Sequence, residues 1–229
     1  MLRRPQDQRK IRVCSCVSIL LSPLVVLCLP NAIQAQEPPI RSETIRPQAF
    51  GGTHEFGLWS GYSPHAGAVV GYVENFTYGV SALRYSYRLR QRSWWSIRYA
   101  PELTILSVLH ENARSPTNPQ APVTHYGAGF SPEAFQLVFL PARRVQPFLS
   151  HAGGILYYNG RVLSPGGSQL MFTVDLGAGV NLFTTRGNAI VAGFRYQHLS
   201  NANISHHNPG ADAQTFYLGF SHFLTHRAR

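Results

Sequence analysis

Residues 188–200 read NAIVAGFRYQHLS, a run in which apolar and polar side chains alternate. Successive side chains of a β-strand point to opposite faces, so the run divides into two sets. The set with Arg195 and Gln197 suits a polar interior, and the set with Phe194 and Tyr196 suits an apolar surrounding. The run therefore predicts a strand between a polar lumen and lipid. The outward set is Ile190, Ala192, Phe194, Tyr196, His198 and Ser200, and the inward set is Val191, Gly193, Arg195, Gln197 and Leu199.

Seven further segments alternate in the same way and are rich in aromatic residues, which is typical of strands. No helix longer than one turn is expected after residue 52. The fold class is therefore predicted to be all-β, with an even number of strands. In chain order the eight expected strands cover residues 53–62, 78–90, 95–108, 127–141, 145–158, 169–183, 188–200 and 213–224.

The connections between these strands alternate between short and long. Short turns on one end and long loops on the other are typical of an eight-stranded antiparallel transmembrane β-barrel of the outer membrane. A soluble eight-stranded barrel of the lipocalin type is the alternative. Aromatic pairs near strand ends, such as Trp94-Trp95 and Tyr157-Tyr158, favour the membrane. The short connections are residues 91–94, 142–144 and 184–187, and the long ones are 63–77, 109–126, 159–168 and 201–212.

The N-terminal 35 residues have the features of a secretory signal peptide. A basic start is followed by an apolar stretch from Val13 to Leu29 and by a small-residue cleavage site that ends at Ala35. We therefore expect residues 1–35 to be a signal peptide, 36–52 a periplasmic lead-in, 53–224 the barrel and 225–229 a C-terminal tail. All three cysteines fall within residues 1–35, so no cysteine-based metal site is expected in the barrel.

The charge balance indicates anionic partners. Removing the five basic and one acidic residue of the leader from 20 Lys and Arg and 10 Asp and Glu leaves 15 against 9, a net charge of +6. A basic exported protein suits phosphorylated lipid headgroups or polyanionic glycolipid. Nucleic acid is not expected as a partner, because the basic residues are scattered and no binding motif is present. The sequence gives no oligomeric state.

Two reactive side chains, His198 and Ser200, end the outward face of residues 188–200. A serine hydroxyl is a weak nucleophile until a base takes its proton, and histidine is the side chain best matched to neutral pH. Such a pair on a lipid-facing wall would make sense if the substrate is a lipid. Asp212 lies where the following loop returns to the next strand, which should lie beside this one. It is therefore the candidate that would orient the imidazole. The alternative is that His198 and Ser200 are ordinary polar residues at the end of a strand. His206 and His207 are interpreted as solvated loop residues rather than metal ligands.

His198-Leu199-Ser200-Asn201-Ala202, followed by Asn208-Pro209-Gly210, resembles the outer-membrane lipid A 3-O-deacylase family, often described as acyloxyacyl hydrolase. The resemblance implies an eight-stranded barrel that hydrolyses the ester-linked acyl chain at position 3 of lipid A. It implies Ser200 as nucleophile, His198 as general base, Asp212 as orienting acid and Asn201 in the oxyanion hole. It further implies a site near the cell-surface leaflet, and no metal or other cofactor.

The sequence departs from the family pattern at two positions. Asp212 is one methylene shorter than the family's glutamate, and Asn203 stands where glycine is common. Two other functions stay open on the sequence alone. One is a non-catalytic small outer-membrane barrel in adhesion or envelope integrity, and the other is a soluble exported barrel that binds an apolar ligand.

Overall fold

The computed structural model describes residues 50–64, 66–67, 69–73, 75–112, 122–164 and 166–224. The expected signal peptide, most of the expected lead-in and the expected tail lie outside the described residues. Strands make up the regular secondary structure of the described part. Within these ranges, no helix is long and apolar enough to cross a membrane.

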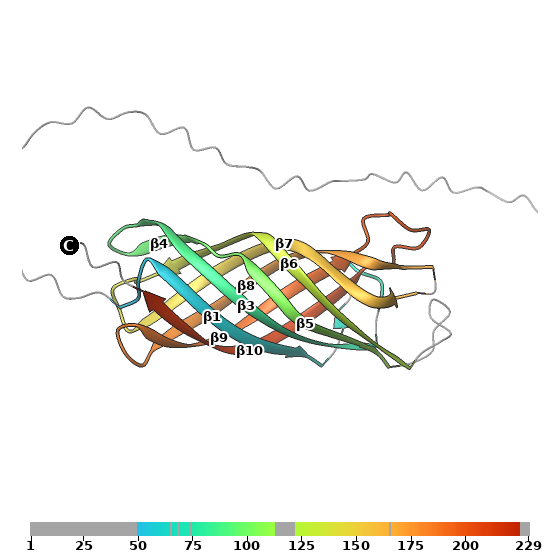
Figure 1. Cartoon of the computed structure of the whole chain (residues 1–229), viewed down its shortest axis with the longest axis horizontal. Helices are drawn as coiled ribbons and strands as arrows, with labels where there is room; N and C mark the ends of the chain where they lie inside the picture. The colour runs from blue at the N-terminus through green and yellow to red at the C-terminus, as the bar shows by residue number, and fades with distance from the viewer. Residues whose placement is uncertain are drawn as a thin grey trace, which may run out of the picture. The chain divides into compact units, whose positions relative to one another are not determined.

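Antiparallel strands form a closed ring in which β1 pairs with β10 (Figure 1). β4 and β5 together fill one position between β3 and β6, and the short β2 pairs with β10 alongside the ring. The ring therefore has eight positions, which confirms the predicted all-β, eight-stranded antiparallel barrel. The strands are β1 His54–Ser63, β2 Ala66–Gly67, β3 Phe76–Gln91, β4 Trp95–Tyr99, β5 Glu102–Glu111, β6 Val123–Phe139, β7 Val145–Val162, β8 Ser168–Phe183, β9 Asn188–Ser200 and β10 Ala211–Leu224.

The third position of the ring differs from the expected single strand 95–108. The structure interrupts it at Ala100 and Pro101, between β4 and β5. Proline has no N–H to donate to a ladder, so it favours such a break. On the neighbouring β6, the register shifts between Phe130 and Glu133.

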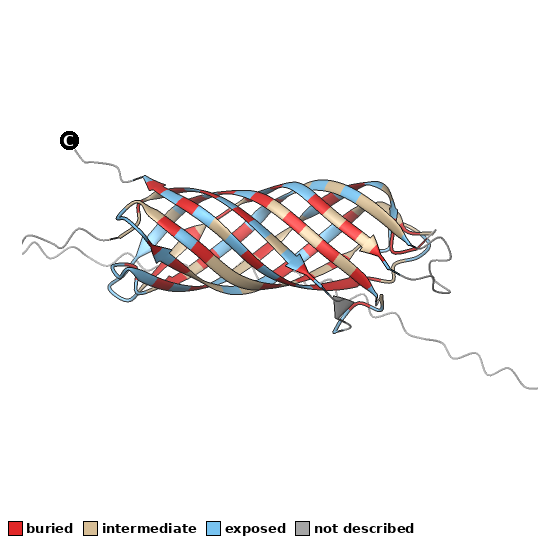
Figure 2. Ribbon diagram, turned by 90° about the horizontal axis from the view of Figure 1, so that it is seen from below, coloured by how far each residue is buried: buried red, intermediate tan, exposed pale blue. Residues whose placement is uncertain are grey.

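Buried and exposed residues alternate along the strands, as Figure 2 shows. On β9, Arg195 and Gln197 are buried in the lumen, whereas Ile190 is exposed. On β10, Thr215 and Tyr217 are buried and Phe216 is exposed. The two faces of β9 therefore point inward and outward as the alternation of its sequence predicted.

Paired charges fill the middle of the lumen. Arg195 donates from Nη1 to Glu102 Oε2 at 2.8 Å, and Arg84 donates from Nε to Glu102 Oε1 at 2.8 Å. Arg195 also lies 3.2 Å from Asp175 and stacks over the ring of Trp59 at 4.4 Å. Buried charges of this kind need partners, because an isolated one is costly. The interior of the barrel thus combines this buried charge network with a cluster of buried hydrophobic side chains.

The two ends of the barrel are different. Short connections join β6 to β7 and β8 to β9 at one end, called the short-turn end below. There Phe50 and Phe223 both pack on the ring of Phe183. The opposite end, called the long-loop end, carries the connections from β1 to β3 and from β9 to β10. The residues of the predicted site lie at the long-loop end.

Candidate active site

His198 and Asp212 meet on neighbouring strands at the long-loop end. They are direct cross-strand partners in the β9–β10 ladder. His198 Nδ1 lies 2.7 Å from Asp212 Oδ1, a hydrogen-bond distance. An ionised carboxylate can only accept, so Nδ1–H is the donor and Nε2 is directed away from the carboxylate. The missing methylene of Asp212 is therefore no obstacle, because the register places the carboxylate opposite the imidazole.

The second oxygen of Asp212 is held by a row of backbone donors. The N–H groups of Val69, Val70 and Gly71 donate to Oδ2 at 2.8, 2.7 and 2.9 Å. The residue has no exposed surface. Four donors around one carboxylate favour its charged form and fix its orientation. Asp212 is therefore a rigid, anionic acceptor for the imidazole.

The segment that supplies these donors is held against β10 by its own backbone. Gly67 of β2 pairs with Asp212, and Val73 bridges to Ala211. Gly71 lies so close to β10 that a Cβ there would be 2.7 Å from the Cα of Ala211. Real side chains do not approach that closely, so the glycine permits the contact. The sequence analysis did not identify this segment, since backbone donors leave no side-chain signature.

Ser200 is the last residue of β9 and lies on the same outward face as His198. Its cross-strand partner on β8 is Phe172, and it is partly exposed. Residues two apart on one strand face are about 7 Å apart. Its hydroxyl makes no hydrogen bond to any of the described residues. The structure thus brings His198 and Asp212 into contact and places Ser200 next to them on the outward face, not hydrogen-bonded to the imidazole.

Asn201 is almost fully buried, at 1% exposure, and its side chain organises the loop after β9. Its amide nitrogen donates to Ser205 Oγ at 2.6 Å and to the carbonyl of His207 at 2.7 Å. Its backbone N–H donates to Asn208 Oδ1 at 2.8 Å. The donors that the resemblance assigns to an oxyanion hole are therefore used inside the loop in this structure.

Left-handed backbone occurs at both sides of this loop. Asn203 has φ 63°, and asparagine tolerates this region better than most residues other than glycine. Gly210 has φ 61°, and a Cβ on it would lie 3.2 Å from Cε1 of His198. Gly210 therefore meets two demands at once, a positive φ and a close approach to the imidazole.

An apolar hollow of about 560 Å³ lies on the outward wall, on the strands that carry the site. The small residues Ala192 on β9 and Ser60 on β1 line part of it. Phe194 and Phe216, whose rings are 5.2 Å apart, lie along the same wall. Because β9 carries both Ala192 and His198 on its outward face, the apolar wall is continuous with the site. Among the described residues, no three His, Asp or Glu side chains gather as a metal site would require.

A family model of lipid A 3-O-deacylase (PagL) matches residues 80–221, more than half of the chain. The match includes His198, Ser200, Asn201 and Asp212. A search of the curated proteins finds no match.

Several solved structures are similar to this chain, and the first of them, with a TM-score above 0.5, shares its fold. The crystal structure of the outer membrane enzyme PagL is 17% identical, with a TM-score of 0.52, and covers 74% of this chain and 99% of that one. Neisserial surface protein A is 15% identical, with a TM-score of 0.48, and covers 76% of this chain and 99% of that one. The attachment invasion locus protein of Yersinia pestis is 13% identical, with a TM-score of 0.41, and covers 76% and 99%.

Proposed function

Because this chain belongs to the lipid A 3-O-deacylase (PagL) family, whose members are ester hydrolases of the outer membrane, we propose that it removes the ester-linked acyl chain at position 3 of lipid A or a related glycolipid. We assign the chemistry to a Ser200-His198-Asp212 triad on the lipid-facing wall. The observation that carries the proposal is the hydrogen bond from His198 to a carboxylate fixed by three backbone donors.

The arrangement suits a general base. With Nδ1–H donated to Asp212, Nε2 of His198 is free to accept the proton of Ser200. The carboxylate then stabilises the imidazolium that forms. Because the apo side chains of such sites are often loosely aligned, a rotation of Ser200 or His198 on substrate binding would close the remaining gap.

The reaction proceeds in two stages. Ser200 Oγ attacks the ester carbonyl as its proton passes to His198, and the tetrahedral intermediate collapses when His198 returns that proton to the departing sugar hydroxyl. Water then attacks the acyl-serine, again losing its proton to His198, and the fatty acid leaves as Ser200 is restored. The net reaction consumes one water for each ester bond that is broken.

The oxyanion that forms in each stage needs donors positioned in advance. We retain Asn201 for this role. Its amide would have to exchange its bond to Ser205 or to His207 for one to the substrate. Asn201→Ala should then lower kcat, whereas Ser205→Ala, which removes one competing acceptor, should not. If Asn201→Ala affects only the thermal stability of the barrel, its role is confined to folding the loop.

The outward wall suits the acyl chain of the substrate. The hollow around Ala192 and the rings of Phe194 and Phe216 would hold an extended acyl chain beneath the reactive groups. This pose places the long-loop end, and with it His198, at the outer leaflet where lipid A headgroups lie. The net positive charge of the chain suits the phosphates of that leaflet.

Mass spectrometry of lipid A tests the proposal in a host without this activity. Expression of the wild type should yield a species that lacks the 3-O-acyl chain. Ser200→Ala and His198→Ala should each abolish it while the barrel keeps its heat-modifiable gel mobility. Unchanged lipid A from a folded wild-type barrel would instead indicate a non-catalytic barrel.

A further inference from the structure

An ionisable pair lies on the outward face of the wall, on the opposite side of the ring from β1 and β10. Glu133 of β6 and His151 of β7 approach at 3.6 Å between Oε1 and Nε2. Their side chains are 51% and 32% exposed. His151 Nδ1 lies 3.2 Å from the carbonyl of Asp175, so its N–H is directed there and Nε2 faces the carboxylate.

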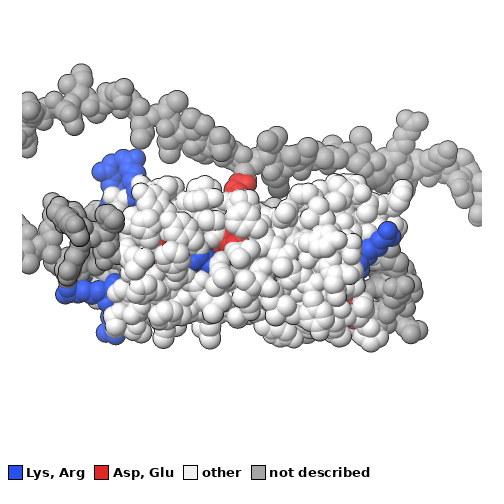
Figure 3. All heavy atoms as spheres, viewed as in Figure 1, with Lys and Arg blue, Asp and Glu red and all other residues white. Residues whose placement is uncertain are grey.

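The surroundings of this pair are apolar. On the face that Figure 3 shows, the basic side chains gather mainly toward the two ends of the barrel, and most of the surface between them is neither basic nor acidic. Glu133 and His151 each lie six residues or more from the ends of their strands. They therefore belong to the part of the wall that faces hydrocarbon in a membrane. The exposed apolar neighbours on β6, β7 and β8 are Phe130, Phe135, Leu149, Ile155, Val174 and Leu176.

Within one chain the two side chains form a loose ion-pair contact and no hydrogen bond with each other. At 3.6 Å the two groups are near but beyond hydrogen-bond distance, and Glu133 accepts no hydrogen bond from another described residue. In hydrocarbon no water replaces the missing partner, so polar side chains there mark a function and pair with one another. The lumen shows the contrast, because Glu102 is held by two arginines.

A second copy of the same wall would supply the missing partners. Two barrels inserted in the same direction are related by a twofold axis along the membrane normal, which sets β6 of one against β7 of the other. Glu133 and His151 lie one diagonal step apart across this strand pair, and because Oε1 and Nε2 are only 3.6 Å apart the two polar groups differ little in depth. The axis would therefore bring each Glu133 opposite the other copy's His151, which is the self-complementarity of an isologous interface.

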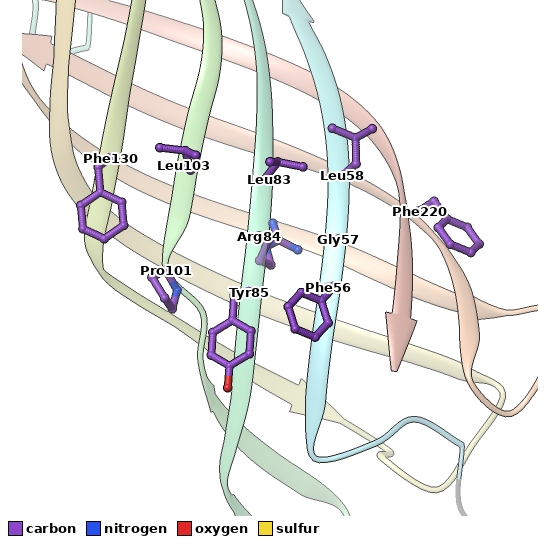
Figure 4. A pocket seen from close by; sticks show the side chains of 10 residues that line it. All are labelled: Phe56, Gly57, Leu58, Leu83, Arg84, Tyr85, Pro101, Leu103, Phe130 and Phe220. Atoms are coloured by element: carbon purple, nitrogen blue, oxygen red, sulfur yellow. The ribbon is translucent and has the colours of Figure 1, made fainter. Parts of the chain in front are cut away.

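The shape of the wall favours a close approach at this point. Gly153 is the cross-strand partner of Glu133, and the atoms nearest to a Cβ placed on it all belong to the Glu133 side chain, at 3.4–3.9 Å. Small residues let membrane-embedded backbones approach. The break at Pro101 leaves a hollow of about 430 Å³ that is lined mainly from β1, β3 and β5 and reaches β6 at Phe130 (Figure 4). A protruding apolar side chain of the facing wall would fit there.

We propose that the β6–β7 wall is a self-association surface, in which Glu133 and His151 of one copy bond to His151 and Glu133 of a second copy within the outer membrane. This pairing gives the Glu133 carboxylate and the Nε2 edge of His151 hydrogen-bond partners in a protein–protein contact. It is independent of the esterase reaction, since the site on β9 and β10 lies on another part of the wall.

Disulfide trapping tests the surface directly, because the described chain contains no cysteine. Gly153→Cys, and Ile155→Cys as a second reporter, would be oxidised in isolated outer membranes. Ile190→Cys, an exposed position on β9 away from this wall, is the matched control. Both reporters should give about tenfold more disulfide-linked dimer than the control, because an interface holds the two thiols at high effective concentration. No excess over the control at either reporter, in barrels with normal heat-modifiable mobility, would overturn the proposal.

A charge exchange tests the pair itself. In the Gly153→Cys background, Glu133→His would set histidine against histidine and should reduce the dimer to the level of the control. Adding His151→Glu would restore one carboxylate and one imidazole at each contact and should restore the dimer. Crosslinking that is indifferent to Glu133→His, or that the double exchange does not restore, would show that the pair does not join the two copies.

Discussion

Asp212 is the direct cross-strand partner of His198, and the two side chains meet at 2.7 Å. This relationship follows from register alone: the loop after β9 returns so that the second residue of β10 stands opposite the third-last residue of β9. An aspartate is long enough at such a position. The backbone donors of residues 69–71 then complete the shell around the carboxylate.

Removing the charge of Asp212 should leave the fold intact and impair catalysis. Asp212→Asn keeps the shape of the side chain but has one acceptor oxygen where the carboxylate has two, and its NH₂ group faces an N–H donor. We therefore expect kcat to fall by about 10²- to 10⁴-fold with little change in KM. Asp212→Glu should lose about tenfold, because its extra methylene must displace the donor segment in a fully buried place. Steady-state hydrolysis of a short-chain ester measures both. Full activity in Asp212→Asn would remove the acid from the mechanism.

Gly210→Ala should disturb His198 from the loop side. A left-handed alanine costs about 1 kcal/mol, and its methyl group would press on the imidazole edge. We expect a lower kcat together with a lower unfolding temperature. Gly79→Ala is the matched control, because a Cβ there would meet only Val108 at 3.9 Å. Equal behaviour of the two variants would contradict the role given to Gly210.

Gly71→Ala should act on the acid through the backbone. The new methyl group cannot lie 2.7 Å from Ala211, so the segment must move and take its N–H donors away from Asp212. Activity should fall toward that of Asp212→Asn. Tyr72→Ala, at an exposed neighbour whose side chain does not touch the carboxylate, should leave short-ester hydrolysis nearly unchanged. Comparing the kcat values of the two variants separates the effect of losing the N–H donors from a general effect of changing the segment.

Glu102→Ala should destabilise the barrel rather than change its chemistry. It leaves Arg84 and Arg195 buried without their shared carboxylate, which typically costs about 3–5 kcal/mol. Thermal loss of heat-modifiable mobility measures the effect, and Arg92→Gln at an exposed turn position serves as control. The fraction that remains folded should hydrolyse ester at the wild-type rate. A large fall in kcat of that folded fraction would link the lumen to the site.

The sequence predicted those features that alternation and spacing control. The eight ring positions and the two faces of β9 follow from a period of two. The proximity of Asp212 to His198 follows because consecutive strands of an antiparallel barrel lie side by side. The break at Pro101 was missed because the flanking residues keep the alternation, and only the proline indicated it.

Features that depend on backbone donors or on loop hydrogen bonds could not be predicted. Every residue except proline carries a backbone N–H, so no sequence pattern marks those of Val69, Val70 and Gly71 as partners of Asp212. The amide of Asn201 could serve substrate or loop, and only the structure shows it bound to Ser205 and His207. The pairing of Glu133 with His151 depends on a bulge in β6 that alternation does not reveal.

The central claim is that Ser200 is a nucleophile activated by His198, and covalent labelling tests it most directly. A fluorophosphonate that reacts with activated serines would be applied to the folded barrel, and the modified peptide would be located by mass spectrometry. We expect labelling of Ser200, slowed strongly in His198→Ala and in Asp212→Asn. Absence of label on Ser200 in a preparation that deacylates lipid A, or lipid A hydrolysis that survives in Ser200→Ala, would contradict it.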